Sequence, residues 1–457
     1  MQGVSTTSYN VAVGTQAGSN VSEGGTNVGH TAGSNGGSRT TSFGYQAALY
    51  PDGNYNTAIG YQALRGNSTS STGYNNVAVG YQAGHDLTSG YRNTLVGYQA
   101  GYDLESGLDN TIIGQQAGVN ITSGPRNTIV GSYAGDALTT VDGVVALGYA
   151  ALGAGAGASY DIAIGYQAHN NGTGRGVFIG LQAGAATTGG GTIIGSEAGE
   201  TNTVGILTLI GYEAGKMVSG TATSMTAVGH GVSTNASGTY HTMVGFQAGN
   251  KLKGNVNTGV GYKVLQSGAN ATHQNNIAIG YQTMQGGDYS VTNQDNVAIG
   301  VNAMRYASGS SYNVVVGQAL FAQDQTSTQV VAIGYRALSG ATSTAATTAI
   351  GHLAARDLTT GDSHTVIGKS AMLKVTTSSY NTVVGVDALS EVDGAGSTTA
   401  VGFGAMKYSS ADNATGIGQY ALSGATGDYN AALGNSAGAI AKGSAGAVMV
   451  GYQAGLR

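Results

Sequence analysis

A glycine that closes a short apolar segment recurs 27 times along the 457 residues, at intervals of 15 to 20 residues. The interval is 17 residues in two unbroken runs, from Gly80 to Gly165 and from Gly300 to Gly402. Such self-similarity is typical of chains that stack one small structural unit on the next. We therefore expect a single repeat domain over residues 1–457, with irregular N-terminal repeats at 1–50 and the main array at 51–457.

The segment before each glycine has the pattern of a β-strand. The residue just before the glycine is apolar in all 27 repeats, and the residue three before it is Thr, Val or Ile in 26 of them. β-branched residues two positions apart share one face of a strand. The residue between them varies from Gly259 to Phe178 and so faces a different environment. A helix is disfavoured, because every period ends in glycine and no apolar stripe recurs at three and four residues.

A tight corner is expected directly after the strand. Alanine stands three residues after the glycine in 23 of 27 repeats, and a recurrent Gly with a recurrent Ala indicates a close approach of backbones. The corner residues of the regular repeats are Gly60, Gly80, Gly97, Gly114, Ala63, Ala83 and Ala100.

The rest of each repeat is polar, with one recurring apolar residue. In many 17-residue repeats it lies seven positions after the glycine, as in Leu87, Leu104, Ile121, Leu138, Leu358 and Val375. We interpret this part as a shorter second strand with one inward side chain, followed by a turn. The predicted fold is thus all-β: a parallel β-roll or β-solenoid of about 27 coils of about 17 residues, with two strands in each coil.

The composition excludes several classes of protein. With 80 Gly but only 2 Pro the chain cannot form collagen, and without Cys it has no disulfides or thiolate metal sites. A net charge of −5 gives no basic surface for nucleic acid, and no run of 18 apolar residues predicts membrane insertion. A coil this small buries little apolar surface by itself, so we expect lateral association into a homo-oligomer.

The repeat resembles a known family of fibrous proteins. The unit Asn56-Thr57-Ala58-Ile59-Gly60-Tyr61-Gln62-Ala63 is similar to the head repeats of YadA-like trimeric autotransporter adhesins. It is more similar still to the Asn-Thr-Ala-Ile-Gly-Tyr-x-Ala arrays in bacteriophage tail fibres. The resemblance covers nearly the whole chain. It implies a left-handed roll and a homotrimer in which the β-branched strand lies near the common axis.

The resemblance also implies a function. It indicates a structural fibre protein, the shaft of a phage tail or virion fibre, whose partners are virion proteins and a host cell-surface glycan. The alternative is a bacterial trimeric surface adhesin or a self-assembling extracellular filament subunit, located at the cell surface. The adhesins' stalk and membrane β-barrel have no counterpart in this sequence. Exposed strand edges at a solenoid end favour stacking of copies end to end, and a truncated or processed chain is the other interpretation.

Two recurring polar positions are candidate sites. Tyrosine follows the glycine in eleven repeats, and these rings either contact a receptor glycan or stack on one another from coil to coil. Asparagine four residues before the glycine is predicted to form an amide ladder. The candidate glycan contacts are Tyr61, Tyr81, Tyr98, Tyr149, Tyr166 and Tyr335, and the amide ladder is predicted at Asn56, Asn76, Asn93 and Asn110.

Enzymatic activity is not expected. The eight His do not share the spacing of metal ligands, and the 22 acidic residues are spread over the whole chain. We therefore predict no catalytic residues, no metal and no cofactor. Columns of Thr at the strand position also suggest ice binding, but Val and Ile share that position and no paired Thr-x-Thr face persists.

Overall fold

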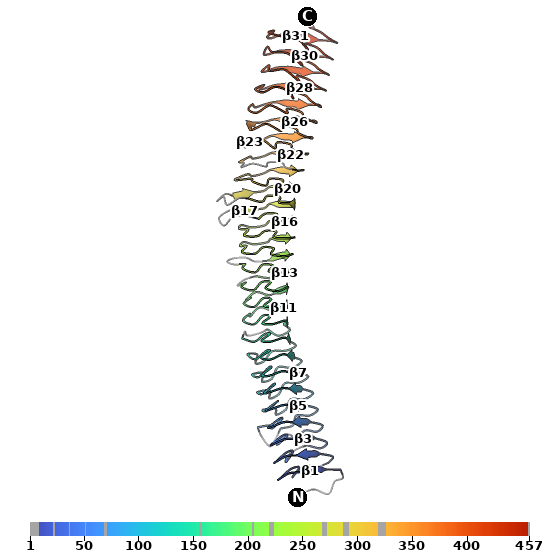
Figure 1. Ribbon diagram of the computed structural model, residues 1–457, viewed down its shortest axis with the longest axis vertical. Coiled ribbons are helices and arrows are strands. Elements are labelled where there is room, and N and C mark those ends of the chain that lie inside the picture. Colours follow the sequence, from blue (N-terminus) through green and yellow to red (C-terminus); the bar gives the residue numbers. More distant parts are fainter. Residues whose placement is uncertain are drawn as a thin grey trace. The chain divides into compact units, whose positions relative to one another are not determined.

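The protein is an all-β parallel solenoid in which each coil contributes one short strand. The computed structural model describes residues 9–455, apart from 22, 36, 51, 68–70, 155–157, 203–204, 219–223, 267–271, 287–291 and 319–325. None of these described residues lies in a helix. The chain divides into two compact units, residues 1–225 and 226–457. In each unit the strands of successive coils lie side by side (Figure 1).

The strands of the first unit pair in parallel with those of the neighbouring coils. In β6, β7 and β8 the partners are Thr94, Thr111 and Thr128, so equivalent residues of the repeat lie above one another. The strands are β1 (Val11–Val13), β2 (Thr26–Val28), β3 (Thr41–Phe43), β4 (Thr57–Ile59), β5 (Val77–Val79), β6 (Thr94–Val96), β7 (Thr111–Ile113), β8 (Thr128–Val130), β9 (Val145–Leu147), β10 (Ile162–Ile164), β11 (Gly176–Ile179), β12 (Gly191–Ile194) and β13 (Leu207–Ile210).

The second unit repeats this arrangement, again with parallel pairs in register. Its main strands are β14 (Met225–Val228, of which the first residue belongs to the first unit), β15 (Thr242–Val244), β16 (Thr258–Tyr262), β18 (Ile277–Tyr281), β20 (Val297–Ile299), β21 (Val314–Val316), β22 (Val331–Ile333), β24 (Thr348–Ile350), β26 (Thr365–Ile367), β27 (Thr382–Val384), β28 (Thr399–Val401), β29 (Thr415–Ile417), β30 (Ala431–Leu433) and β31 (Val448–Val450).

The predicted second strand is wrong for most coils. Among the described residues, outer strands occur only in the second unit, as β17 (Thr272–Gln274), β19 (Thr292–Gln294), β23 (Ser343–Ala345) and β25 (Thr360–Asp362). Elsewhere this part of the coil is a series of turns, although Leu87 and Leu104 are buried as expected. The turns still stack, since the amide of Asp86 donates to the carbonyl of Tyr102 in the next coil at 3.0 Å, an ordinary hydrogen-bond distance.

The chain turns because several positions in each coil have left-handed backbone. In the coil of Gly97 these are Arg92, Gln99 and Gly101, with φ of 58°, 52° and 57°. Non-glycine residues rarely adopt this region, which costs roughly 1 kcal/mol each. These left-handed residues change the direction of the chain before and after the main strand. Hydrogen bonds to the neighbouring coils offset the cost of the corners.

The glycine that ends each strand is required by the stacking itself. Gly80 and Gly97 have φ of 139° and 138°, a region that L side chains rarely adopt. A Cβ atom at Gly97 would lie 2.4 Å from the carbonyl oxygen of Gly114, and one at Gly80 would lie 2.2 Å from that of Gly97. The alanines of the corner, Ala83 and Ala100 among them, are fully buried. Only glycine therefore allows successive coils to approach this closely.

The core is a narrow column inside the coils. The middle residue of each strand points into it, as do the corner alanine and the apolar residue of the turns; Leu95, Ala100 and Leu104 are all completely buried. The two residues that flank Leu95 in its strand point outward instead, because side chains alternate along a strand. The pair of β-branched residues thus lies on the outer face of the sheet.

Candidate functional site

An exposed apolar face runs along the main sheet of each unit. It is formed by the first and third residues of the strands, which carry the β-branched side chains. Ile59 and Val77 in the first unit are 40% and 38% exposed, and Ile333 and Ile367 in the second are 37% and 39% exposed. Large apolar side chains exposed in a continuous row mark surfaces that contact other molecules. We call these outward strand residues the sheet face.

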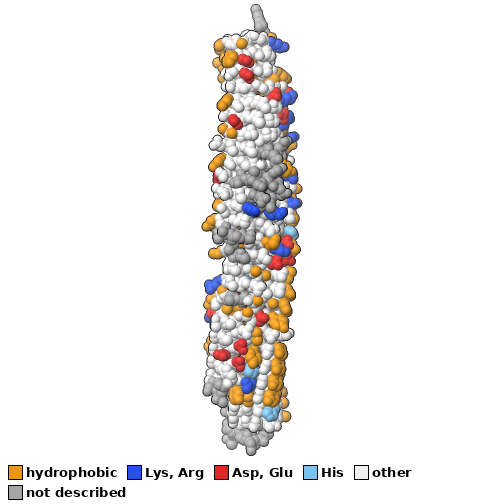
Figure 2. All heavy atoms as spheres, turned by 90° about the vertical axis from the view of Figure 1, so that its left-hand side faces the viewer, with side chains coloured by type: hydrophobic (Ala, Val, Ile, Leu, Met, Phe, Trp, Pro, Cys, Tyr) orange, Lys and Arg blue, Asp and Glu red, His pale blue; other side chains and the backbone are white. Residues whose placement is uncertain are grey.

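The tyrosines that follow the corner glycine form a column next to the sheet face. Tyr61 stacks on Tyr81 with ring centroids 5.0 Å apart and planes 6° apart, and Tyr81 stacks on Tyr98 at 5.2 Å. Tyr149 stacks in the same way on Tyr166, at 5.2 Å. Figure 2 shows hydrophobic side chains gathered in stripes along part of one face, where charged groups are few and scattered.

The stacking restricts what the candidate glycan contacts can do. Each ring in the Tyr61–Tyr98 stack covers the faces of its neighbours, so the edges and hydroxyls remain for a ligand. Tyr335 in the second unit stacks on His352, with centroids 5.3 Å apart. Sugars bind aromatic side chains through the ring face. A pyranose could therefore stack on a tyrosine only where the column ends or is broken.

A column of glutamines accompanies the tyrosines, and the sequence analysis did not single it out. Gln occupies the left-handed position two residues after the glycine, and its side-chain amide donates to the carbonyl of the glutamine one coil earlier. Gln82 donates to Gln62 at 3.0 Å, Gln99 to Gln82 at 3.1 Å and Gln116 to Gln99 at 3.2 Å. The recurring Gly-Tyr-Gln triplet was the signal in the sequence that could have revealed this column.

The four asparagines predicted to form an amide ladder lie in one buried row. Asn76, Asn93 and Asn110 each donate from the side chain to the side-chain oxygen of the preceding asparagine, at 3.2, 3.1 and 3.0 Å, starting from Asn56. The same oxygen also accepts the backbone amide of the next asparagine, at 2.9–3.0 Å. The row therefore joins neighbouring coils through both side chain and backbone.

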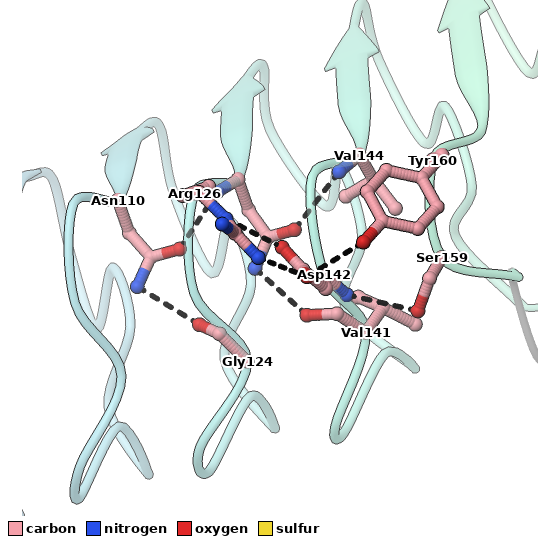
Figure 3. Close-up of polar contacts among 9 residues, drawn as sticks. Asn110, Gly124, Arg126, Val141, Asp142, Val144, Ser159 and Tyr160 are labelled. Carbon is pink, nitrogen blue, oxygen red and sulfur yellow. Dashed lines mark hydrogen bonds and ion pairs between the residues drawn. The ribbon is translucent and has the colours of Figure 1, made fainter.

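Each asparagine also fixes a turn of the following coil. In Figure 3 the side-chain amide of Asn110 reaches the carbonyl of Gly124, at 3.0 Å. The side-chain oxygen of Asn110 accepts the backbone amide of Asn127, which in turn donates to Val141 at 3.1 Å and accepts from Val144 at 3.0 Å. A buried amide is thus satisfied on both its donor and acceptor sides, which accounts for its recurrence.

Charged pairs lie on the solvent side of the turn that carries the buried asparagine. The guanidinium of Arg92 binds both carboxylate oxygens of Asp109, at 2.6 and 2.7 Å. Arg126 pairs with Asp142, which also accepts the hydroxyl of Tyr160 at 3.0 Å (Figure 3). Hydrogen bonding from Arg126 lowers the pKa of Asp142 below its ordinary value. These pairs are exposed, so they contribute little to stability.

Histidine takes the place of asparagine at two buried positions of the second unit. The ring of His364 accepts the backbone amide of Asn381 at Nδ1 (3.3 Å), and its Nε2 lies 2.9 Å from the carbonyl oxygen of Ser378. These contacts require the neutral ring with its proton on Nε2. His241 likewise accepts the amide of Asn257 at Nδ1. Burial lowers the pKa of both rings.

Two further histidines are buried without replacing an asparagine. His273 in β17 is almost completely buried, and neither of its ring nitrogens has a hydrogen-bond partner. Burial lowers its pKa to about 4. In the first unit, His169 is fully buried and stacks on Phe178 with centroids 3.7 Å apart, and burial lowers its pKa to about 4. His169, His241, His273 and His364 are therefore neutral at pH 7.

Within the described parts of the chain, no group of three or more His, Asp or Glu side chains is placed to hold a metal ion. The same residues include no helix that is long and apolar enough to cross a bilayer. Neither a protein-family model nor any curated protein sequence matches the chain. The sites are thus defined by geometry alone: the sheet face, the tyrosine and glutamine columns, and the buried polar ladder.

Proposed function

We propose that the protein is a structural fibre protein: the homotrimeric shaft of a phage tail or virion fibre that contacts the host surface. One observation carries the proposal: hydrogen bonds between neighbouring coils pair the polar groups of the buried asparagine row, but the sheet face is left exposed. Asn93 and its neighbours complete the bonding between coils, whereas the outward β-branched residues of the strands stay partly exposed, Ile59 by 40%. Stacking thus needs no other chain, and the sheet face is left for one.

Covering the sheet face supplies the driving force for association. Full burial of a Val or Ile contributes about 1.5–3 kcal/mol, so covering the remaining exposed part contributes about 0.5–1 kcal/mol per residue. One apolar residue of this kind recurs in every coil, just before the corner glycine; a second occurs where the first strand position is Val or Ile, as with Val77 and Val79 in β5, whereas many other coils have Thr there. Summed along a unit, the gain is comparable to the translational and rotational cost of assembling chains, which is about 4–15 kcal/mol.

The proposed attachment to a host is multivalent. The exposed edges of the tyrosine column recur from coil to coil, and a trimer would present three copies of each. Identical weak contacts on one rigid support bind a surface much more tightly than a single contact does. Polymeric surface glycans, with their own repeating units, are the corresponding kind of receptor.

The assembly is tested by the mass of the purified protein in solution. Sedimentation equilibrium should give three times the chain mass, 45.3 kDa. The double substitution Ile59→Lys and Val77→Lys places charges on the sheet face and should reduce association at least tenfold. The matched control, Ser89→Lys with Ser106→Lys, adds the same charge at exposed turn positions and should leave the trimer intact. A folded, monodisperse wild-type monomer would contradict the proposal.

The role of the assembly is tested by electron microscopy and by binding to cells. A phage or virion shaft should form discrete particles of one length that bind host cells and dock to virion proteins. Purified protein that polymerises head to tail by itself would favour the filament instead, and a chain displayed on a bacterial surface would favour the adhesin. Binding to no cell type and no glycan array would exclude attachment as its role.

A further inference from the structure

Two successive coils of the first unit interrupt the glutamine column between Gln116 and Gln167. The left-handed position two residues after the corner glycine is Gln in the coil that contains Gln116 and again in the coil that contains Gln167. In the two coils between them this position holds Tyr133 and Ala150, whose φ values of 57° and 49° keep the corner itself unchanged. The backbone is therefore continuous here while the side-chain ladder is not.

The interruption leaves a hollow of about 280 Å³ on the surface. Its floor is the middle coil, where small residues replace larger ones: Ala150, Gly153 and Ala154. The walls come from the coils on either side. The lining side chains that carry polar or aromatic groups are Tyr133, Asp136, Tyr149, Gln167 and Asn170.

The interruption also releases hydrogen-bonding groups into the hollow. Gln167 accepts from Gln182 at 3.2 Å, as expected in the column. Its own side-chain amide should donate to the coil before it, but Ala150 has no side-chain oxygen to accept the bond. Asn170 accepts the backbone amide of Ala154 at 3.0 Å through its side-chain oxygen, which leaves its NH₂ group as a second donor.

Asp136 supplies the acceptor on the opposite wall. Its carboxylate forms no ion pair with any described Lys, Arg or His, in contrast to Asp109 and Asp142 on the neighbouring coils. Partial burial raises the pKa of its carboxyl above the ordinary value, which shows that the group is partly removed from water. A half-buried carboxylate without a cation is best satisfied by hydroxyl or amide donors.

The tyrosine column is broken at the same place. Tyr133 meets Tyr149 edge-on, at an interplanar angle of 73° with centroids 5.9 Å apart. Within the described chain no ring lies parallel on Tyr133, whereas Tyr61 and Tyr81 cover each other's faces. The hydroxyl of Tyr133 accepts the side-chain amide of Gln115 at 3.2 Å, which orients the ring. Here an aromatic ring without a parallel stacking partner lies beside unpaired donors and an acceptor.

We propose that this hollow binds one neutral pyranose ring of a glycan. An aromatic face, two amide donors and a carboxylate that accepts vicinal hydroxyls are the groups that recognise such a ring. The volume lies near the lower limit of small-molecule pockets, about 300 Å³, and so admits one ring but not a disaccharide. The carboxylate disfavours acidic sugars. This inference rests on the proposed function only in that a host-contacting fibre would meet such glycans.

The sequence of the repeat provides a test variant that should fold. Ala150→Gln restores the residue that other coils carry at this left-handed position, gives Gln167 an acceptor and fills the hollow. Binding of methyl glucoside, methyl galactoside and methyl N-acetylglucosaminide to the full chain can be measured by saturation-transfer NMR and titration calorimetry. At least one of them should bind the wild type, and Ala150→Gln should weaken this binding at least tenfold while leaving the melting temperature unchanged or higher.

Asp136→Asn tests the carboxylate, and a distant substitution provides the control. The Asp136→Asn variant should bind the neutral glycoside more weakly. It should also allow methyl glucuronide, which the wild type should reject, to compete. Gln99→Ala, which removes a glutamine from an intact part of the column, should leave glycoside binding unchanged. Absence of glycoside binding to the wild type, or equal binding by Ala150→Gln, would overturn the inference. A trimer that binds no glycoside refutes this inference alone, and a monomer that does bind one refutes the proposed assembly alone.

Discussion

The two units are built from the same coil but satisfy it with different side chains. In the first unit Asn56, Asn76, Asn93, Asn110 and Asn127 form an unbroken buried row. In the second unit the equivalent positions include His241 and His364, each followed by an asparagine that donates its backbone amide to the ring. The coil thus accepts an imidazole acceptor in place of the amide at this position, and in other coils it accepts a buried side chain without an acceptor, such as Val330 or Ala414.

The cores of the two units are also filled by different side chains. At the middle strand position the first unit has Leu95, Ile112 and Ile129, whereas the second has mostly smaller residues such as Val315 and Ala332, with methionine at Met243 and, in the turns, at Met304 and Met372. The second unit also has the outer strands β17, β19, β23 and β25. Methionine is flexible and adapts to irregular space. The comparison shows that the backbone ladder and its glycine corner are fixed, while the residues that fill the coil are interchangeable.

The largest expected effect removes the feature that the units share. Gly97→Ala in the first unit and Gly300→Ala in the second place a Cβ atom 2.4 and 1.9 Å from the carbonyl oxygen of the next corner. Each substitution should cost more than about 4 kcal/mol locally, because neither backbone can move away without breaking its own ladder. Denaturant unfolding, with amide hydrogen exchange assigned to each unit, measures the loss.

The control for this substitution is Gly446→Ala. Gly446 also has positive φ, 71°, but a Cβ atom there would meet no atom within 4 Å. The expected cost is about 1 kcal/mol, from the backbone conformation alone. If all three variants lost the same stability, the close approach of the coils would not be the reason why glycine recurs at the corner of every repeat.

The next effect concerns the buried row. Asn93→Ala removes the acceptor for the backbone amide of Asn110 (3.0 Å) and the donor for the carbonyl of Gly107 (2.8 Å). Each buried group left without a partner costs about 1–3 kcal/mol, so a loss of about 3 kcal/mol is expected at pH 7. Unfolding of the variant in urea tests this value.

Asn93→His sharpens the comparison, because it moves the arrangement of the second unit into the first. At pH 7 the ring should replace most of the lost bonds, as His364 does with Asn381 and Ser378. The variant should therefore be more stable than Asn93→Ala at pH 7 and lose this advantage at pH 5. Equal stability of the two variants at pH 7 would mean that the ring cannot substitute for the amide.

The pH dependence should differ between the units. The pKa of His273 is lowered to about 4 and those of His241 and His364 are lowered as well, while the first unit has His169 alone, also at about 4. Because the unfolded chain then binds protons more readily, stability is complete above about pH 6.5 and falls as the pH drops toward 4. The second unit should therefore lose more stability than the first unit as the pH falls.

The contribution of His273 can be isolated by His273→Asn, which copies its partner Asn293 in the neighbouring outer strand. A shift of the pKa from 6.5 to about 4 corresponds to roughly 3 kcal/mol at most. The free energy of unfolding of the variant should therefore fall by up to that amount less than that of the wild type when the pH drops to 4. His352→Gln, at an exposed ring, is the control. Urea midpoints at pH 7.5 and 4.5 measure the difference, and identical shifts in both variants would contradict the assignment.

The smallest effect is expected on the surface. Arg92→Ala removes the pair with Asp109, which is exposed to solvent and screened by salt. Its effect on unfolding should be smaller than those above and should vanish at 1 M NaCl. An effect as large as that of Asn93→Ala would mean that the exposed pairs, rather than the buried row, join the coils of the first unit.

Much of the fold followed from the sequence because equivalent residues stack on one another. The 27 glycines located the corners, and the flanking β-branched residues located the strands. The predicted second strand failed in most coils because this part of the repeat turns instead of extending, and hydrogen bonds to the neighbouring coils hold the turns, as from Asp86 to Tyr102. The left-handed φ at Gln99 and Arg92 also has no clear signal in residue type, since Gln and Arg do not favour that region.

The sequence by itself determined the period, the strand and the residues that must be glycine, since each depends on one position repeating in register. Only the tertiary structure decided which way the side chains point and what they meet: that Ile59 faces outward, that the tyrosine rings cover one another, and that Ala150 opens a hollow beside Asp136 and Gln167. The physical reason is that a repeat fixes what is common to all coils. A site arises where one coil departs from its neighbours, and its shape depends on the side chains above and below it.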